Sequence, residues 1–197
     1  MKNKKTAFII LAAGKGKRIK TKDDKVLLPI AGLPMIQHII RTVSLIRPNQ
    51  IIPVISPRMS DLQKGLTGIR CAIQKKQKGT ADAVVAAQSL LRRFKGNIVV
   101  LCGDTPFVSA NTLRSLLRQL ERNRGHDLVI LGTKAKNARQ YGRILTDDQG
   151  KPRKIVESLD MSSSESKASL CNSGIIAAKS KVLFNLLRLV KNKNFIQ

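Results

Sequence analysis

Short apolar runs alternate with longer amphipathic stretches along most of this 197-residue chain. The runs have the length of buried strands, and the stretches between them repeat apolar residues at the spacing of one helix face. Strands that alternate with helices form βαβ units, so we predict an α/β fold of the Rossmann-like type, with a mostly parallel, mixed sheet flanked by helices. The predicted strands of this part are residues 6–11, 51–55, 70–74, 97–102 and 127–132.

Helix starts are indicated by residues that favour the first turn or cap it. Pro34 is suited to the first turn of a helix whose apolar face covers residues 35–43. Thr80 and Ser109 are suited to cap two further helices. A last helix is predicted where leucine and valine recur over residues 182–190.

The pattern changes after residue 140. Two short runs, residues 143–146 and 154–158, are separated by the turn-forming sequence Asp-Asp-Gln-Gly, which predicts a β-hairpin inserted in the fold. The serine-rich residues 160–169 are predicted to form a mobile loop. A further strand is expected at residues 170–177, before the last helix.

The first predicted strand leads into a loop rich in glycine and basic residues. Glycine lets the backbone approach a ligand and leaves amide donors exposed, while lysine and arginine neutralise phosphate oxygens. A loop of this kind after a strand is where an open α/β sheet binds a polyphosphate. The residues concerned are Gly14, Lys15, Gly16, Lys17, Arg18 and Lys25.

Two other interpretations of this segment stay open. The basic start, the apolar run and Ala12-Ala13-Gly14 also fit a secretory signal peptide with a short apolar part. A charged loop can also be a solvated turn that binds no ligand. The segment lacks the third glycine of the dinucleotide-binding fingerprint and does not match the G-x-x-x-x-G-K-[ST] phosphate loop, so neither of those sites is predicted.

Asp104 follows the central apolar strand 97–102 after a single glycine, Gly103, and precedes a Thr-Pro pair. The carboxyl end of a strand is the edge where open α/β sheets bind ligands. One carboxylate beside phosphates suits Mg²⁺, which needs only one or two protein carboxylates. Asp104 is therefore a candidate magnesium ligand, and a turn-capping aspartate is the alternative.

Two further groups of polar residues lie at predicted strand ends. Gln74 can both donate and accept in-plane hydrogen bonds, as recognition of a base requires. Gly79 and Thr80 begin a predicted helix and offer amide donors, although an ordinary helix cap explains them equally. Three motifs later in the chain lie at strand edges, where hydroxyl-bonding side chains would select a sugar, although Glu157 and Asn172 also fit ordinary surface residues. Their residues are Tyr141, Gly142, Arg143, Glu157, Asn172, Ser173 and Gly174.

The charge of the chain is extreme, with 37 lysines and arginines against 12 aspartates and glutamates and a formal net charge of +25. Such a field attracts polyanions. The basic residues are spread along the whole chain and only 3% of residues are aromatic, so we predict no specific nucleic-acid site.

Three widely spaced cysteines favour neither a disulfide framework nor a zinc site. Because no apolar run is long enough to span a membrane, we expect no membrane partner and a cytoplasmic protein.

Several short motifs occur in the order and spacing of one enzyme family. They are LAAGKGKR, DKVL, GLPMIQHII, QKKQKGTADAV, LCGDTPF, YGRI, IVES and NSGII. Over essentially its whole length the chain resembles the N-terminal pyrophosphorylase domain of the bacterial bifunctional N-acetylglucosamine-1-phosphate uridylyltransferase/glucosamine-1-phosphate acetyltransferase. The first and fifth motifs are shared by many sugar nucleotidyltransferases, whereas QKKQKGTADA, YGRI and NSGI are typical of the uridylyltransferase.

The resemblance implies a Mg²⁺-dependent reaction of UTP with N-acetylglucosamine 1-phosphate. The products would be pyrophosphate and UDP-N-acetylglucosamine, a precursor of cell-wall polysaccharide. It also implies that Arg18 and Lys25 are catalytic and that Asp104 binds the magnesium ion. The implied sugar contacts are Gly142, Glu157 and Asn172. The implied nucleotide contacts are Leu11, Ala12, Ala13, Gly14, Lys15, Gln74, Gly79, Thr80, Cys102 and Gly103.

The chain departs from the family pattern, with Lys17, Asp24 and Cys102 where threonine or serine, proline and tyrosine are usual. The family's domain continues beyond Gln197, with an asparagine as second magnesium ligand, and an acetyltransferase β-helix follows. We therefore expect a nucleotidyltransferase domain over residues 1–197 that is incomplete at its C-terminus, and the oligomeric state stays open. The alternatives are a weakly active or inactive nucleotide-binding remnant, another NTP transferase such as a molybdenum-cofactor guanylyltransferase-like protein, and a polyanion-binding protein.

Overall fold

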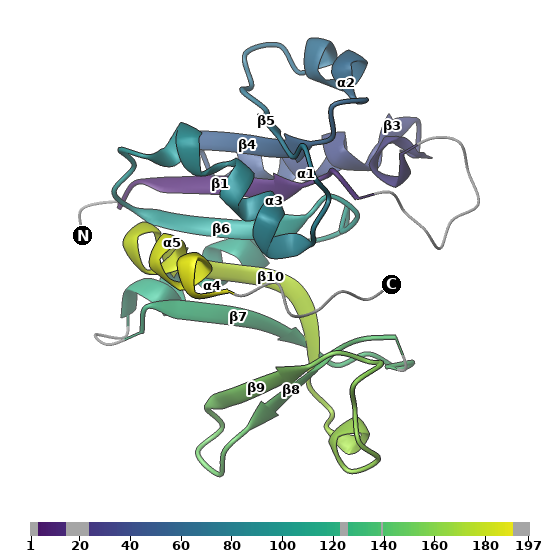
Figure 1. Ribbon diagram of the computed structural model, residues 1–197, viewed down its shortest axis with the longest axis vertical. Helices are drawn as coiled ribbons and strands as arrows, with labels where there is room; N and C mark the ends of the chain where they lie inside the picture. Colours follow the sequence, from purple (N-terminus) through teal and green to yellow (C-terminus); the bar gives the residue numbers. More distant parts are fainter. Residues whose placement is uncertain (1–3, 15–23, 123–125, 139, 191–197) are drawn as a thin grey trace. The chain divides into compact units, whose positions relative to one another are not determined.

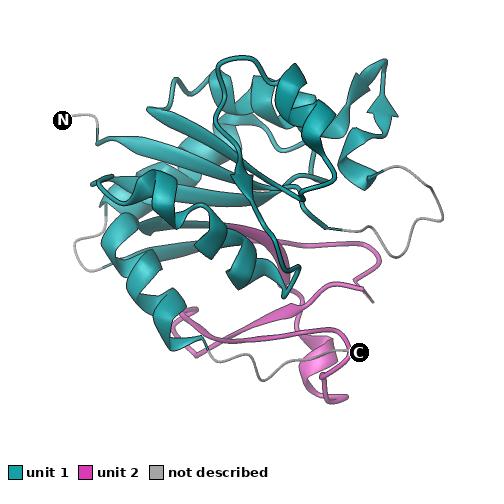
Figure 2. Ribbon diagram, turned by 45° about the horizontal axis from the view of Figure 1, so that its top comes forward, with its two compact units in different colours: residues 1–129, 176–197 teal, residues 130–175 magenta. Residues whose placement is uncertain are grey.

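The protein divides into two compact units (Figures 1 and 2). The computed structural model describes residues 4–14, 24–122, 126–138 and 140–190. The first unit comprises residues 1–129 and 176–197, and the second comprises residues 130–175. The predicted α/β fold, with a mostly parallel sheet flanked by helices, is confirmed.

The sheet of the first unit has four parallel strands in the order β5-β4-β1-β6. The last residues of β10 then pair with β6 in the antiparallel direction. Because the register aligns the final residues of β1, β4 and β6, their carboxyl ends lie at one edge of the sheet. These strands are β1 (Thr6–Leu11), β4 (Gln50–Ile55), β5 (Ala72–Ile73), β6 (Asn97–Cys102) and β10 (Cys171–Lys179).

Strand β1 is buried on both faces. Its consecutive residues Ala7, Phe8, Ile9 and Ile10 are all inaccessible to solvent. A strand covered on both sides has no polar face, which explains why its sequence is a continuous apolar run without alternation. The strand is thus fixed in the middle of the core, and only its ends approach the surface.

Helices cover both faces of this sheet, with α3 and α5 in front of the strands and α1 and α4 behind them in Figure 1. On the front face, Val84 and Leu183 belong to the same buried cluster as Ile9 of the sheet. The helices are α1 (Met35–Ser44), α2 (Ser60–Gly65), α3 (Thr80–Ala86), α4 (Ala110–Arg122) and α5 (Ser180–Leu189).

Helix starts agree with the sequence predictions only in part. Ser109 caps α4 as predicted, because its hydroxyl oxygen accepts the N–H of Thr112 at 3.1 Å. Thr80 is the first residue of α3 and not its cap. Gly79 holds the cap position with φ of +109°, a backbone conformation that other residues rarely adopt. Pro34 is the residue before α1 and lies outside the predicted first turn.

The predicted strands agree with the structure to within two residues at each end, but several short elements had not been predicted. Helix α2 contains one leucine and no repeated apolar spacing, and the other missed elements are too short to show a period. They are the strands β2 (Pro29–Ile30) and β3 (Leu33–Pro34) and the 3₁₀ helix η1 (Lys25–Leu27), whereas the 3₁₀ helix η2 (Gln88–Leu91) covers the end of the helix predicted to begin at Thr80.

The second unit contains the predicted hairpin. Its turn is closed by Asp147, whose carboxylate accepts the N–H groups of Gln149 and Lys151 at 3.0 and 2.8 Å. The first residue of β10 pairs with the first residue of β8, so the hairpin extends the sheet of this unit. Its other strands are β7 (Leu128–Thr133), which begins in the first unit, β8 (Arg143–Thr146) and β9 (Pro152–Val156).

Residues 160–169, predicted as a mobile loop, contain the 3₁₀ helix η3 (Glu165–Lys167). The Glu165 carboxylate accepts the N–H and the hydroxyl of Ser162, both at 2.9 Å. These bonds lower the pKa of the Glu165 carboxyl below its ordinary value, and Lys154 adds to the effect. The serine-rich composition therefore supplies local caps in this segment.

Candidate active site

The carboxyl edge of the parallel sheet brings together most of the nucleotide residues predicted in the first unit. Backbone hydrogen bonds continue the strand pairing past the strand ends. The Ala12 N–H donates to Val54 and the Gly103 N–H donates to Leu11, both at 2.8 Å, and the Gln74 N–H donates to the last residue of β4 at 2.9 Å. The predicted residues at this edge are Leu11, Ala12, Ala13, Gly14, Gln74, Cys102 and Gly103.

Gly103 marks a close approach between two strand ends. A Cβ atom at this position would lie 2.9 Å from the carbonyl oxygen of Leu11 and 3.0 Å from Cγ1 of Val26. Glycine is the residue that permits such an approach, because any side chain would separate the two segments. As a result, Asp104 is held next to the segment that follows β1.

Lys25 and Asp104, two predicted site residues, form an ion pair at this edge. The distance between Lys25 Nζ and Asp104 Oδ2 is 2.7 Å, and the two side chains are 32% and 37% exposed. An ion pair so accessible to water contributes little to stability. The pair does place an ammonium group and a carboxylate at the edge where open α/β sheets bind ligands.

Cys102 is the last residue of β6, beside this ion pair. Burial raises the pKa of its thiol to about 11; the Asp104 carboxylate adds to the rise and the Lys25 ammonium opposes it. The thiol is therefore protonated at neutral pH, and only the thiolate is an effective nucleophile. A protonated, half-buried thiol has the character of a small apolar residue, and Cys102 packs as one at the end of β6.

We expect Cys102 to resist alkylation by iodoacetamide at pH 8, with a rate that rises towards pH 11. Asp104→Asn removes a carboxylate that raises the thiol pKa, so it speeds the reaction. Folding raises the pKa of the Cys102 thiol from 9.0 to about 11. The stabilisation of the folded state that follows from this shift is therefore complete below pH 9.0 and is lost as the pH rises to about 11. Peptide mass spectrometry measures the labelling, and equal rates in native and urea-unfolded protein at pH 8 would contradict the expectation.

Asp24 is neutralised by a residue that the sequence did not indicate. Its carboxylate forms an ion pair with Arg58, and its side chain is only 10% exposed. Asp24 stands beside Lys25 where the family usually has proline, and no local sequence pattern connects it with Arg58, 34 residues later. The pair also fixes the backbone directly before Lys25.

The segment after β5 is bound to the same edge through two glutamine side chains. Nε2 of Gln74 donates to Oδ2 of Asp82 at 2.8 Å and to the carbonyl oxygen of Gly79 at 3.2 Å. The Gln77 amide donates to the carbonyl oxygen of Ala13. Sequence reasoning identified Gln74 and Gly79 but missed Asp82 and Gln77, which hold them in place.

The three predicted sugar residues lie together in the second unit. The N–H of Asn172 donates to the carbonyl oxygen of Gly142 at 2.8 Å. A Cβ atom on Gly142 would lie 3.4 Å from each carboxylate oxygen of Glu157. The backbone of Gly142 and Asn172 and the Glu157 carboxylate are thus neighbours, while Oδ1 of the Asn172 side chain accepts the N–H of Gly174 at 3.0 Å. Carboxylate and amide groups are of the kind that bind sugar hydroxyls.

Arg143, which the sequence grouped with these residues, is only 5% exposed. Its guanidinium donates to the carbonyl oxygens of Ala138, at 2.7 Å, and Tyr141. These bonds fix the segment before β8. Arg143 therefore supports the backbone around Gly142, and the structure gives it a positioning role.

Lys15, Lys17 and Arg18 lie outside the described residues. Within the part of the chain that the structure describes, no group of three or more histidine, cysteine, aspartate or glutamate side chains could hold a metal ion. Magnesium needs fewer protein ligands than that, so Asp104 stays the candidate.

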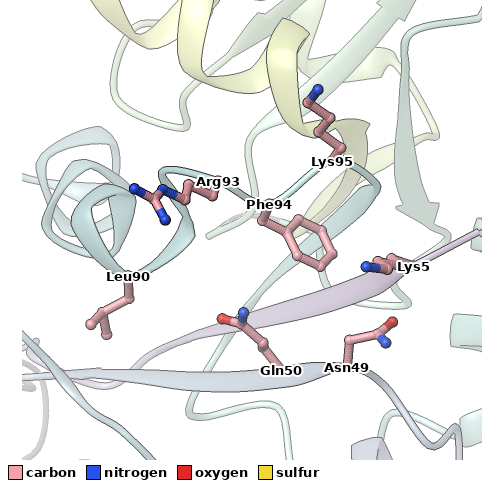
Figure 3. Close-up of a pocket in the computed structure, with 7 residues that line it drawn as sticks. All are labelled: Lys5, Asn49, Gln50, Leu90, Arg93, Phe94 and Lys95. Atoms are coloured by element: carbon pink, nitrogen blue, oxygen red, sulfur yellow. The ribbon is translucent and has the colours of Figure 1, made fainter.

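A cavity of about 510 Å³ opens at the opposite, amino edge of the sheet in the first unit (Figure 3). Apart from Leu90, which lies in η2, its lining residues come shortly before or at the start of β1, β4 and β6. It is therefore separate from the edge that carries Asp104. The residues that line it are Lys5, Asn49, Gln50, Leu90, Arg93, Phe94 and Lys95.

The strand order and the residues at the carboxyl edge define a nucleotidyltransferase fold. Residues 8–166 match the family described as the MobA-like NTP transferase domain, and the chain belongs to this family. It is also similar to the protein named bifunctional protein GlmU from Novosphingobium aromaticivorans, with 41% identity over 189 residues. That alignment covers 95% of this chain and 42% of the relative, so the chain spans less than half the length of the curated relatives it matches. The predicted family resemblance is confirmed.

Solved structures support the same fold. A Bacillus anthracis protein described as a glucose-1-phosphate thymidylyltransferase aligns with a TM-score of 0.76 and 24% identity, covering 94% of this chain and 76% of that one. A CMP:2-keto-3-deoxy-manno-octonic acid synthetase complexed with CTP aligns with a TM-score of 0.70 and 20% identity, covering 95% and 79%. Among the described residues, no helix is long and apolar enough to cross a membrane.

Proposed function

We propose that the chain transfers a uridylyl group from UTP to N-acetylglucosamine 1-phosphate, giving UDP-N-acetylglucosamine and pyrophosphate. The observation that carries this proposal is the Lys25–Asp104 pair at the carboxyl edge, next to the backbone that follows β1. Similarity to GlmU over 95% of the chain supports the choice of substrates. The reaction would contribute a precursor of cell-wall polysaccharide.

In this reaction, a phosphate oxygen of the sugar phosphate attacks the α-phosphorus of UTP. The new P–O bond forms as the bond to the β-phosphate oxygen breaks, and pyrophosphate leaves. No covalent enzyme intermediate is needed, so catalysis consists of positioning and of neutralising charge. Lys25 and Arg18 would supply the positive charge, and the backbone of residues 11–14, with Lys15, would hold the phosphates.

Asp104 is the residue that would hold a magnesium ion. A carboxylate at the carboxyl edge, partly exposed and not enclosed by other ligands, fits an ion that keeps several waters and binds substrate phosphates. The ion would supply further neutralisation of phosphate charge. Lys25 keeps the carboxylate paired within the protein.

The remaining proposed contacts fall into a nucleotide group and a sugar group. Gln74, Gly79 and Thr80 would bind the uridine. Cys102 and Gly103, at the end of β6, would lie beside it. In the second unit, Gly142, Glu157 and Asn172 would bind the N-acetylglucosamine part. The hydrogen bond between Asn172 and Gly142 supports a shared subsite.

A direct assay tests the proposed function. The full chain is incubated with N-acetylglucosamine 1-phosphate, Mg²⁺ and one nucleoside triphosphate, and pyrophosphate and the sugar nucleotide are quantified. We expect product with UTP and much less with GTP or CTP. A preference for GTP would favour a guanylyltransferase, and UTP binding without product would favour a nucleotide-binding protein without turnover. RNA affinity that survives excess UTP would instead indicate a polyanion-binding protein.

A further inference from the structure

The side-chain amide of Gln74 is held in one orientation by two acceptors. Its Nε2 donates to the Asp82 carboxylate at 2.8 Å and to the Gly79 carbonyl at 3.2 Å. Neither a carboxylate nor a carbonyl oxygen can donate a hydrogen bond. The reversed amide would place its own oxygen against two other oxygens, so the chemistry of the neighbours decides which atom faces them.

Burial makes this orientation costly to change. Gln74 is only 4% exposed, and a buried amide that loses its partners cannot replace them fully with water. The bond to a charged carboxylate is stronger than one between neutral groups, particularly in a site of low dielectric constant. Asp82 is therefore the stronger of the two restraints on the Gln74 amide.

Both acceptors of the Gln74 amide, the Gly79 carbonyl and the Asp82 carboxylate, belong to the start of α3. Gly79 is the residue before α3, and Asp82 lies in the first turn of that helix, where a carboxylate is favoured by the helix dipole. The N–H of Ala83 donates to the Gly79 carbonyl at 3.2 Å, so this carbonyl is itself fixed by the helix. The two acceptors thus approach Gln74 as one rigid unit.

We propose that Asp82 is a positioning residue that orients the Gln74 amide. In this orientation only the amide oxygen, a hydrogen-bond acceptor, is offered to the nucleotide base. The inference rests on the proposed function, in which Gln74 binds the uridine. No described residue donates to Oε1 of Gln74, which leaves this oxygen as the group that the amide offers to a ligand. Uracil carries a ring N3–H that can donate to it, whereas N3 of cytosine is an acceptor and is repelled.

UTP and CTP are a matched pair of probes because their bases differ only at N3 and at the exocyclic group beside it. Affinities of both nucleotides for the full chain are measured by calorimetry in the presence of Mg²⁺, for wild type and Asp82→Asn. An asparagine can donate as well as accept, so Gln74 is released to turn either atom towards the base. We expect the ratio of UTP to CTP affinity to fall about tenfold, which corresponds to one hydrogen-bond pairing.

Asp61→Asn is the matched control, because Asp61 is also the acidic residue in the first turn of a helix of this unit. Its side chain is 93% exposed and forms an ion pair with Lys64 on the same helix. We expect this variant to leave the UTP to CTP ratio unchanged. A purely structural effect of losing a first-turn carboxylate would change the affinities of both nucleotides together and not their ratio.

A second measurement requires no nucleotide. In NMR spectra, the Gln74 side-chain NH₂ protons are expected to exchange slowly in wild type and faster in Asp82→Asn, and unchanged exchange would overturn the inference. If wild type prefers UTP and Asp82→Asn keeps the same ratio, the inference is wrong while the proposed function stands. If wild type binds neither nucleotide, the proposed function fails and the inference fails with it.

Discussion

We expect Asp104→Asn to lower pyrophosphate release from UTP and N-acetylglucosamine 1-phosphate by about 10²–10³-fold, the usual effect of removing one electrostatic contact to a reacting group. The asparagine keeps the shape of the side chain but removes the charge that pairs with Lys25 and that would bind magnesium. The fold should be unaffected, because the lost ion pair is partly exposed. Initial rates at saturating concentrations of both substrates measure the change, and circular dichroism checks the fold.

Asp127→Asn provides the matched control. Asp127 forms an ion pair with Lys179 at 2.6 Å, and these side chains are also partly exposed. Asp127 lies directly before β7 and Lys179 is the last residue of β10, so the pair is remote in the chain from every proposed site residue of the first unit. Its removal should leave the rate unchanged. A rate for Asp104→Asn within a fewfold of wild type, or an equal loss in both variants, would contradict the assignment of Asp104.

The second large effect concerns folding. A Cβ atom on Gly96 would lie 2.1 Å from the carbonyl oxygen of Lys5, where two backbone segments meet before β6 and β1. A backbone carbonyl cannot rotate away as a side chain does, so the strands must separate. We expect Gly96→Ala to destabilise the protein by about 3 kcal/mol, the upper part of the usual range for overpacking. For a chain of this size the thermal midpoint falls by about 6–12 °C, which a melt followed by circular dichroism measures.

Gly65→Ala is the control for that substitution. No atom lies within 4 Å of the added Cβ at this position, and Gly65 is a helical residue of α2. Alanine favours helix more than glycine, so the variant should be as stable as wild type or more stable by up to about 1 kcal/mol. A similar loss of stability in Gly65→Ala and Gly96→Ala would show that the close contact between Gly96 and the Lys5 carbonyl does not cause the destabilisation.

The arrangement of the first unit could be predicted from sequence because its signals are local. The run Thr6–Leu11 is apolar throughout because β1 is buried on both faces, and the leucines of Ala110–Arg122 recur at helical spacing because one face of α4 is buried. Asp104 could be identified because it lies two residues after the end of an apolar strand, β6. Gly79 was identified as a site residue, but its role as the cap of α3 required the observed backbone angle.

The partners of the site residues could not be predicted. Arg58 neutralises Asp24, and Asp82 orients Gln74, yet neither pair is indicated by a repeating pattern. Such pairs depend on how separate segments meet at the sheet edge, which the composition and spacing of either segment do not determine. The missing information was thus tertiary, and it concerns orientation more than the identity of the site residues.

The sheet of the first unit is completed late as the chain leaves the ribosome. Its four parallel strands have all been synthesised at Cys102, but the residues of β10 that pair with β6 follow the whole second unit. Pairing Ile176 with Val100 closes a long loop, and the entropy of that closure is lost before the contact can form. Until then the edge of β6 has unpaired backbone groups of the kind that favour association between chains. The pairing of β10 therefore closes an edge of β6 that stays open until the second unit has been synthesised.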